Sequence, residues 1–269
     1  MNHLHRELAP ITEEGWSTID DEAKGRLGTY LAARRLVDFH GPRGWDFSAV
    51  NLGRTTAVSG DSPAGVEVRS REVLPLVEYR VPFEVDLSEL AALSRGATDI
   101  DLDALDDAAK RIALAENATV FHGFSAAGIT GIASASAHEP IVVGRNFESY
   151  PQHVARAVRV LLEAGISGPF GLALSSDIWT TVVESTEHGG YPLFEHLRKA
   201  IVGGPIVWAP GLEGGVVLSQ RGGDFRFESG EDISIGYLHH DRAHVTLYLE
   251  ESFTFKVDTP DAAVSLALE

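Results

Sequence analysis

The sequence has no cysteine, only 22 lysines and arginines against 39 aspartates and glutamates, and no long apolar run. Without cysteine the chain cannot form disulfides, thiolate metal sites or a cysteine nucleophile. The formal net charge of −17 repels phosphate, so we expect neither nucleic acid nor an anionic membrane surface as a partner. No stretch reaches the ~18 apolar residues of a membrane helix, and residues 1–6 do not lead into a signal-peptide core. We therefore expect a cytoplasmic protein.

Sequence motifs for catalysis are also missing. There is no phosphate-binding loop and no dinucleotide fingerprint, and Ser125 misses the nucleophile-elbow pattern because the next glycine comes one residue late. The densest histidine cluster joins His239-His240 to His244, but adjacent strand residues point to opposite sides, which favours a surface turn. The acids of residues 99–103 lack the glycine and terminal glutamate of a calcium loop. The sequence thus predicts no catalytic residue, no metal and no cofactor, hence not an enzyme.

The N-terminal third predicts one helix followed by an isolated pair of strands. Thr12 is a candidate N-cap, and apolar residues then recur at helical spacing as far as Ala33. Residues 49–58 and 66–74 read as two strands of a polar ribbon. A lone two-stranded ribbon is marginal in water, so it rests either on its own domain or on another subunit. We favour the second.

The middle of the chain predicts helices and then a mixed α/β unit. Asp86 should cap a short helix that Gly96 closes, and a longer helix should start near Asp101 and end before Val120. Residues 140–210 alternate between helices and strands, which indicates a compact α/β insert. Its expected elements are a helix over 151–164, a strand over 170–174, a helix capped by Ser176, a helix over 193–201 and a strand over 205–208.

The last quarter predicts mainly β-structure. Apolar residues at odd positions from 245 to 257 alternate with mostly polar ones, which is typical of a long strand with one buried face. Glu251 interrupts that face and must find an arginine, another donor or water; we expect it at the rim of the sheet. The stretch Arg221-Gly222-Gly223-Asp224 resembles a ligand loop, but its glycines also suit a joint between domains, with Asp224 capping the turn. We favour the joint.

The chain resembles type 1 encapsulin shell proteins, the linocin-like family, in short stretches that keep their order over nearly the whole length. These stretches are residues 8–12 before Trp16, 34–38, 41–45, 128–132, 189–193, 221–225, 233–237 and 251–255. The resemblance implies an α+β protein with the major-capsid fold of tailed phages, the Hong Kong 97 type. It also implies a division into an N-terminal arm and helix (1–44), an extended loop (45–75), a peripheral domain (76–134), an axial domain (135–222) and a return to the peripheral domain (223–269).

The resemblance further implies a structural role. Sixty copies would close into an icosahedral compartment around a cargo enzyme, a dye-decolourising peroxidase or a ferritin-like iron oxidase, held by its C-terminal peptide. The matching positions of the peptide groove are Leu31, Arg34, Asp38, Ile233 and Ile235. Apolar residues would supply the groove, and an Arg34–Asp38 pair would orient the peptide backbone. The alternative is that Arg34 and Asp38 form an ordinary ion pair at a helix end.

Two further positions follow from the same resemblance. The expected five-fold pore loop comprises Glu184, Ser185, Thr186, Glu187, His188, Gly189, Gly190 and Tyr191. Repeated around an axis, Glu184 and Glu187 would favour cations such as Fe²⁺, whereas alone the loop is only a connection. Some relatives bind flavin beside a tryptophan, but Ser88 stands at that position here, so we predict no flavin.

Two alternatives to the shell protein stay open at this point. A phage major capsid protein would share the fold but would package DNA, which the −17 net charge disfavours. A soluble enzyme with an unrecognised site is the other.

Overall fold

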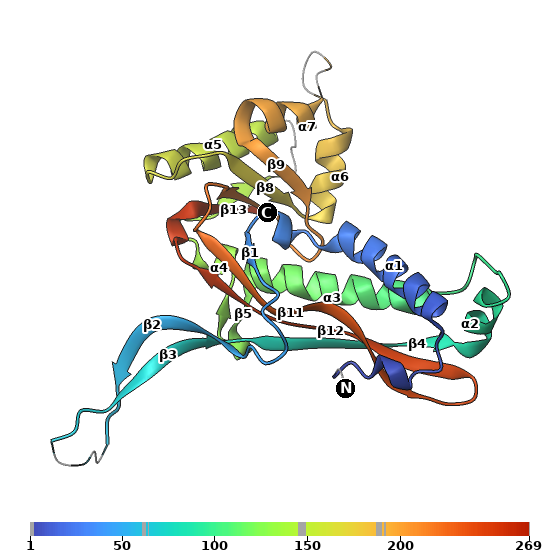
Figure 1. The fold of residues 1–269 in the computed structure, drawn as a ribbon. Coiled ribbons are helices and arrows are strands. Elements are labelled where there is room, and N and C mark those ends of the chain that lie inside the picture. Colours follow the sequence, from blue (N-terminus) through green and yellow to red (C-terminus); the bar gives the residue numbers. More distant parts are fainter. Residues whose placement is uncertain are drawn as a thin grey trace.

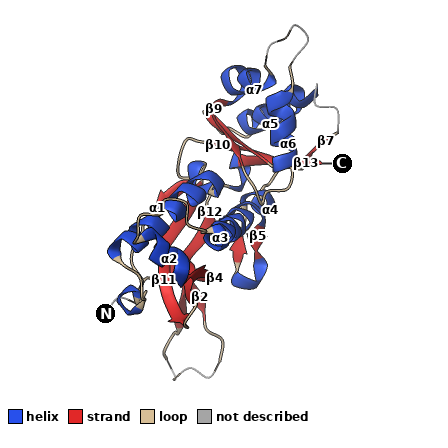
Figure 2. Cartoon of the chain, turned by 90° about the vertical axis from the view of Figure 1, so that its right-hand side faces the viewer, coloured by secondary structure: helices blue, strands red, loops and turns tan. Residues whose placement is uncertain are grey.

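The computed structural model describes residues 3–60, 63, 65–144, 149–186, 190 and 192–268. Figure 1 shows two lobes, each built on one sheet, with a ribbon of two strands that projects from the larger lobe. Figure 2 shows the same two lobes from the side. None of the helices in the described residues is long and apolar enough to cross a membrane.

The larger lobe is a four-stranded sheet covered by two helices. The strand order is β1 (Asp38–His40), β11 (Phe225–His240), β12 (His244–Val257) and β4 (Val77–Asp86). Helices α1 (Glu13–Tyr30) and α3 (Asp103–His122) lie over this sheet, and their apolar faces share one core with it (Figure 1). The short helix α2 (Leu87–Leu93) follows β4. The predicted cap of α2 is confirmed, because Asp86 Oδ1 accepts from the Ser88 amide at 2.7 Å.

Helix α1 begins as predicted and ends earlier. Thr12 Oγ1 accepts from the Gly15 amide at 3.1 Å, which confirms the N-cap. The helix stops at Tyr30, however, and not near Ala33. The reason is Asn117 on α3, whose Oδ1 accepts from the amides of both Ala32 and Ala33 at 3.0 Å. These amides therefore need no partner inside a continued helix.

Helix α3 is longer at its C-terminal end than predicted. It runs through Val120 and His122 and stops at Gly123, which has a φ of +89°. The helix was expected to end before Val120, but Val120 and Phe121 are fully buried on it. Burial against the neighbouring elements therefore outweighs their weak helix propensity.

The smaller lobe is a five-stranded sheet with helices packed on it. Its order is β7 (Ile141–Val143), β13 (Ala263–Leu268), β10 (Gly215–Ser219), β8 (Phe170–Leu174) and β9 (Gly203–Trp208). Its helices are α5 (Tyr150–Glu163), α6 (Ser176–Glu184) and α7 (Leu193–His196), which continues as a π-helical turn over Leu197–Val202. Strand 170–174 has the predicted bounds. The predicted cap of α6 is wrong by one residue, because Ser175 is the N-cap.

Strand β13 departs from the expected division of the chain. The boundaries between domains stay a prediction, but residues 223–269 do not all return to the larger lobe. Strand β13 lies in the smaller lobe, where Leu266 pairs with Gly215 of β10 and with Ile141 of β7. Its alternating residues Val264 and Leu266 are buried in that lobe's core, which accounts for the placement.

Strand β12 is covered on both faces, so the prediction of a single buried face is wrong. Its odd-numbered apolar residues face the helices, and the polar residues from Thr246 to Thr254 on the other face are buried as well. Gly236 on β11 makes room for this second layer. A Cβ there would lie 2.1 Å from the ring of Tyr248, so the missing side chain lets Tyr248 lie flat on the sheet.

The ribbon consists of β2 (Ala49–Ala57) and β3 (Arg69–Pro75), paired antiparallel. In Figure 1 it projects away from both lobes. Four valines of this segment, Val58, Val66, Val68 and Val73, are exposed. Val50 at the base of the ribbon is buried against its own subunit, whereas the outer residues from Arg54 to Ala57 and from Arg69 to Arg71 are exposed, so this outer part does not rest on its own domain.

The remaining elements are short. They are η1 (Arg6–Leu8), η2 (Ala33–Arg35), β5 (Gly123–Phe124), η3 (Ser125–Ala127), β6 (Ile129–Thr130), α4 (Ile132–Ala135) and η6 (Pro260–Ala262).

Residues 221–224 form the joint between the two lobes, after β10 and before β11. Gly222 and Gly223 have φ angles of +83° and +80°, a region that residues with a β-carbon avoid. Both oxygens of Asp224 accept from the Arg221 guanidinium, at 2.8 and 2.9 Å. The segment turns the chain, as predicted.

Candidate functional site: a groove beside the N-terminal helix

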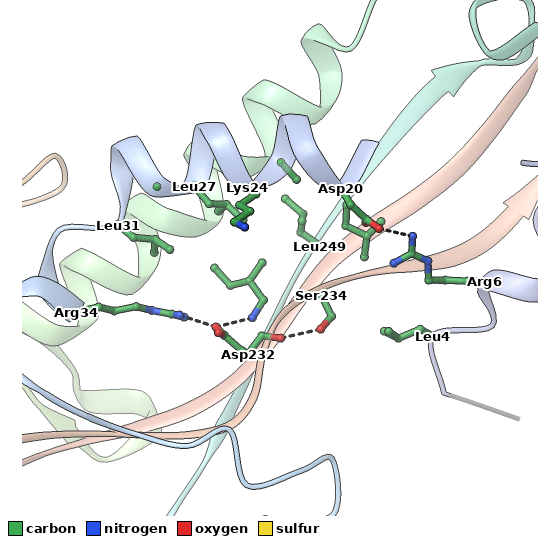
Figure 3. Close-up of a pocket in the computed structure, with 14 residues that line it drawn as sticks. Leu4, Arg6, Asp20, Lys24, Leu27, Leu31, Arg34, Asp232, Ser234 and Leu249 are labelled. Atoms are coloured by element: carbon green, nitrogen blue, oxygen red, sulfur yellow. Dashed lines mark hydrogen bonds and ion pairs between the residues drawn. The ribbon is translucent and has the colours of Figure 1, made fainter. Parts of the chain in front are cut away.

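A groove of about 490 Å³ runs between α1 and the β11–β12 sheet (Figure 3). This volume lies within the range of about 300–1,000 Å³ that is usual for ligand sites. The groove is lined by the N-terminal arm (Leu4, Arg6), by α1 (Asp20, Ala23, Lys24, Leu27, Gly28) with Leu31 and Arg34 after it, by β11 (Asp232, Ile233, Ser234, Ile235) and by Leu249 of β12.

The floor of the groove is apolar. Ala23 and Leu27 are four residues apart on α1, so both side chains face the sheet. Ile235 is directly opposite Leu249 in the β11–β12 register, and both are buried. Leu31 stands at the helix end and is half-buried. Such a floor suits apolar side chains of an extended peptide.

The edges of the groove are charged. Arg6 pairs with Asp20 at 2.7 Å at one end, and Arg34 pairs with Asp232 at 2.5 Å at the other. Between them the amine of Lys24 points into the pocket (Figure 3). Gly28 exposes its backbone, since a Cβ there would meet nothing within 4 Å. A bound chain can therefore approach α1 closely at this point.

Arg34 is fixed by a buried cluster of carboxylates. Its guanidinium lies 2.6 Å from Glu116 and 2.9 Å from Glu251. Glu251 is 1% exposed, so the prediction that it sits at the sheet rim is wrong. Burial, together with the charge of Glu116, raises the pKa of Glu251 well above its usual value. Burial likewise raises the pKa of Glu116, so this pair of carboxyls holds on to a proton.

Four of the five predicted groove residues lie together. Leu31, Arg34, Ile233 and Ile235 line the same cavity. Asp38 does not line it: Asp38 is on β1, where its Oδ2 accepts from the Gly223 amide at 2.6 Å in the joint. Asp38 therefore does not pair with Arg34.

Four charged residues of the groove were not predicted from the sequence, and they are Arg6, Asp20, Lys24 and Asp232. Asp232 takes the role expected of Asp38, and its position directly before Ile233 was an available signal. Lys24, by contrast, is one turn before Gly28 on a helix that carries several exposed charges. Nothing in the sequence alone marks it.

The expected pore loop is only partly described. Four residues expected in this loop lie outside the described residues, and they are Glu187, His188, Gly189 and Tyr191. Glu184 ends α6 and is exposed, and Gly190 is exposed too. The two ends of the loop are held together, because the Leu193 amide donates to Ser185 O at 3.1 Å and Thr186 bridges to Pro192. In Figure 1 this part of the chain is at the far tip of the smaller lobe.

Solved structures with the same fold come from a virus-like particle, from phages and from a GTA particle. A virus-like particle protein from Pyrococcus furiosus matches with a TM-score of 0.64 at 16% identity, over 93% of this chain and 98% of that one. A structure of Mycobacterium phage Bobi matches with a TM-score of 0.57 at 13% identity, over 88% and 89% of the two chains. The capsid of an empty GTA particle matches with a TM-score of 0.52 at 15% identity, over 88% of this chain and 90% of that one. The fold is therefore that of the capsid proteins of tailed phages.

Sequence comparison then gives the family. The family described as "Encapsulating protein for peroxidase" (Linocin_M18) matches residues 1–254, and the chain belongs to it. The type 1 encapsulin shell protein of Rhodospirillum rubrum is 48% identical over 271 residues, which cover 99% of this chain and 96% of the relative. That of Brevibacterium linens is 42% identical over 268 residues, the full length of both chains.

Proposed function

We propose that this protein is the structural subunit of a closed icosahedral compartment that forms by self-assembly. The observation that carries the proposal is the ribbon β2–β3, which projects from the subunit and exposes Val73, with Val58, Val66 and Val68 exposed just beyond its strands. Isolated two-stranded ribbons are marginal in water, so this one is stable when a neighbouring copy covers it. The family and the capsid fold support the same reading.

We further propose that the compartment encloses an enzyme by binding its C-terminal peptide in the groove beside α1. The apolar floor takes the peptide's side chains, while Lys24 and Arg34 supply positive charge at the edge. The family description favours a peroxidase as the cargo. A ferritin-like iron oxidase is the second candidate, since the same groove would accept any tail of matching chemistry.

The assembly would use the smallest closed shell, of sixty copies, because the chain is short, with 269 residues, and matches a shell protein over the full length of both chains. In that shell the loop between α6 and α7 would surround the five-fold axis. Exposed Glu184 would then give the opening a negative potential that favours cations.

Two glycines on α1 provide a matched test of the groove. Gly28 lines it and Gly25 does not, and in both cases an added Cβ meets nothing within 4 Å. Leucine at either position improves helix propensity by a similar amount. Gly28→Leu should therefore lower cargo co-purification at least tenfold, and Gly25→Leu should leave it unchanged.

The measurement is the ratio of cargo to shell in particles purified after co-expression, with electron microscopy of the same particles. Equal cargo retention by the two variants would contradict the groove assignment. Wild-type protein that stays monomeric would contradict the shell itself.

A further inference from the structure

Three potential metal ligands converge on the side of the β11–β12 sheet that faces away from the groove. They are His3 of the N-terminal arm, Glu231 of β11 and Glu250 of β12, and their ligand atoms lie within 4.8 Å of one another. His3 Nε2 is 2.7 Å from Glu231 Oε2 and 3.9 Å from Glu250 Oε1. Glu250 and Glu251 are adjacent on one strand, so they point to opposite faces, and only Glu251 joins the Arg34 cluster.

An irregularity in β11 aims Glu231 at this cluster. Glu231 pairs with Ser252, whereas Ser234 pairs with Glu250, so the register shifts between them. Bulges of this kind redirect side chains and often occur at functional positions. Here Asp232 turns to Arg34 on the groove side, and Glu231 turns to His3 on the other.

Each of the three ligand atoms lacks a hydrogen-bond partner although it is buried. His3 Nε2 and Glu231 Oε2 are close but are not aligned for a hydrogen bond. Glu250 is 0% exposed, and Arg80 Nε donates to its Oε2 at 2.6 Å, which leaves Oε1 directed at the other two residues. Buried polar atoms without a partner are rare, and each requires an explanation such as a bound ion.

The surroundings are also prepared for a cation. The ring of His3 stacks on Trp45 with centroids 4.0 Å apart, which fixes the imidazole and limits solvent. Glu78 also stands beside Arg80, so the single Arg80 guanidinium is shared by two carboxylates, Glu78 and Glu250. Burial raises the pKa of Glu250, Arg80 lowers it, and Glu78 and Glu231 raise it further. A cation between the carboxylates would relieve this repulsion.

We propose that His3, Glu231 and Glu250 bind one divalent transition-metal ion. One imidazole and two carboxylates form a nitrogen and oxygen donor set of the kind that Zn²⁺ and Mn²⁺ accept. Such bonds are about 2.0–2.2 Å long, so two ligands of one ion lie at most about 4.4 Å apart, close to the span of this cluster. Arg80 serves as the outer partner that orients Glu250.

The ion would fasten the N-terminal arm to the sheet. Leu4 follows His3, is buried, and lines the groove on the other side of the arm. At present Leu4 O accepts from the Tyr237 amide at 2.8 Å. A metal bond one residue earlier would hold this edge of the groove in place. The metal site is defined by its three ligand residues alone and does not depend on which cargo the groove binds.

The test is Zn²⁺ binding to the full-length chain, expressed without cargo, stripped with a chelator and measured by isothermal titration calorimetry. We expect one ion per chain in the wild type. His3→Ala and Glu231→Gln should each weaken binding at least tenfold. The matched controls are His5→Ala, a second histidine of the same arm, and Glu67→Gln, which removes an equal charge on the distant ribbon.

A second measurement needs no variant. Hydrogen exchange of the Tyr237 amide should slow on adding Zn²⁺, because the ion immobilises the N-terminal arm whose Leu4 carbonyl accepts from this amide. Loss of affinity in His3→Ala and Glu231→Gln but not in the controls supports the site. Equal binding by His3→Ala, or a wild type that takes up no ion, overturns it and leaves His3 and Glu231 as an ion pair only.

Discussion

The ribbon β2–β3 and the hairpin β11–β12 are both antiparallel strand pairs, yet they differ in what covers them. The hairpin is buried on both faces along much of its length, and its charged residues are paired in the interior. The ribbon exposes both faces, including its valines. The hairpin therefore stabilises the subunit, whereas the contact proposed with another copy falls on the ribbon. Under the proposed function, folding and assembly depend on different parts of one chain.

Removing Arg34, the cation that pairs with the buried Glu251 of the hairpin, should have the largest effect on folding. Arg34→Ala leaves Glu116 and Glu251 buried without their cation, which costs about 3–5 kcal/mol. We expect a markedly lower melting temperature and less soluble protein, measured by calorimetry. A variant that melts with the wild type would show that the cluster contributes little.

A charge on the ribbon should instead disrupt assembly and spare folding. Val73 is 51% exposed in the subunit, so Val73→Asp should change subunit stability by no more than about 0.5 kcal/mol. In a shell the same aspartate would be buried against a neighbour without a partner, and closed particles should be lost. Light scattering measures this, with the isosteric Val73→Thr as a milder control. Intact particles from Val73→Asp would show that this face of the ribbon is not needed for assembly.

Part of the pH dependence of stability comes from the buried carboxyl of Glu251, which interacts with that of Glu116. The pKa of Glu251 is raised in the folded state, so the folded chain binds that proton more tightly than the unfolded chain does. Its stabilising contribution is therefore complete below the ordinary pKa and is lost as pH rises through the raised value.

Glu251→Gln cannot ionise and keeps an oxygen for Arg34. The variant should thus lose less stability than the wild type between acidic and neutral pH. At the upper end we expect a melting temperature roughly 2–4 °C higher, the shift that about 1 kcal/mol gives in a chain of this size. If the melting temperatures of the two proteins change with pH in the same way, Glu251 does not contribute to the pH dependence.

The smallest effect belongs to the ion pair on the ribbon. Glu67 and Arg69 lie 2.9 Å apart and both are well exposed. Exposed pairs contribute about 0–1 kcal/mol, so Glu67→Gln should leave melting and assembly nearly unchanged. A large loss of particles in this variant would mean that Glu67 contacts a neighbouring copy.

Much of the fold could be predicted because local signals agreed with the tertiary structure. Thr12 and Asp86 cap their helices, and residues 170–174 form the expected strand. The errors arose where a distant residue decides the outcome. Asn117 ends α1 early, although it lies 85 residues away from Ala32. No pattern near Ala32 encodes that contact.

The groove could be predicted only in outline. Leu31 and Ile235 were expected in the groove from the resemblance to encapsulin shell proteins, but the carboxylate that partners Arg34 depends on how β1 and β11 are placed. Asp38 is used by the joint, so Asp232 takes its place. The cluster of His3, Glu231 and Glu250 has no motif spacing, because its members meet only after the arm and two strands have come together.

Strand β13 has a consequence for how the protein is made. It lies between β7 and β10, so in the smaller lobe β7 joins the other strands only through residues 263–268. During translation, residues 141–143 must wait for more than a hundred further residues to leave the ribosome before their sheet can close. Prematurely terminated products lack this strand, so their smaller lobe cannot complete its sheet.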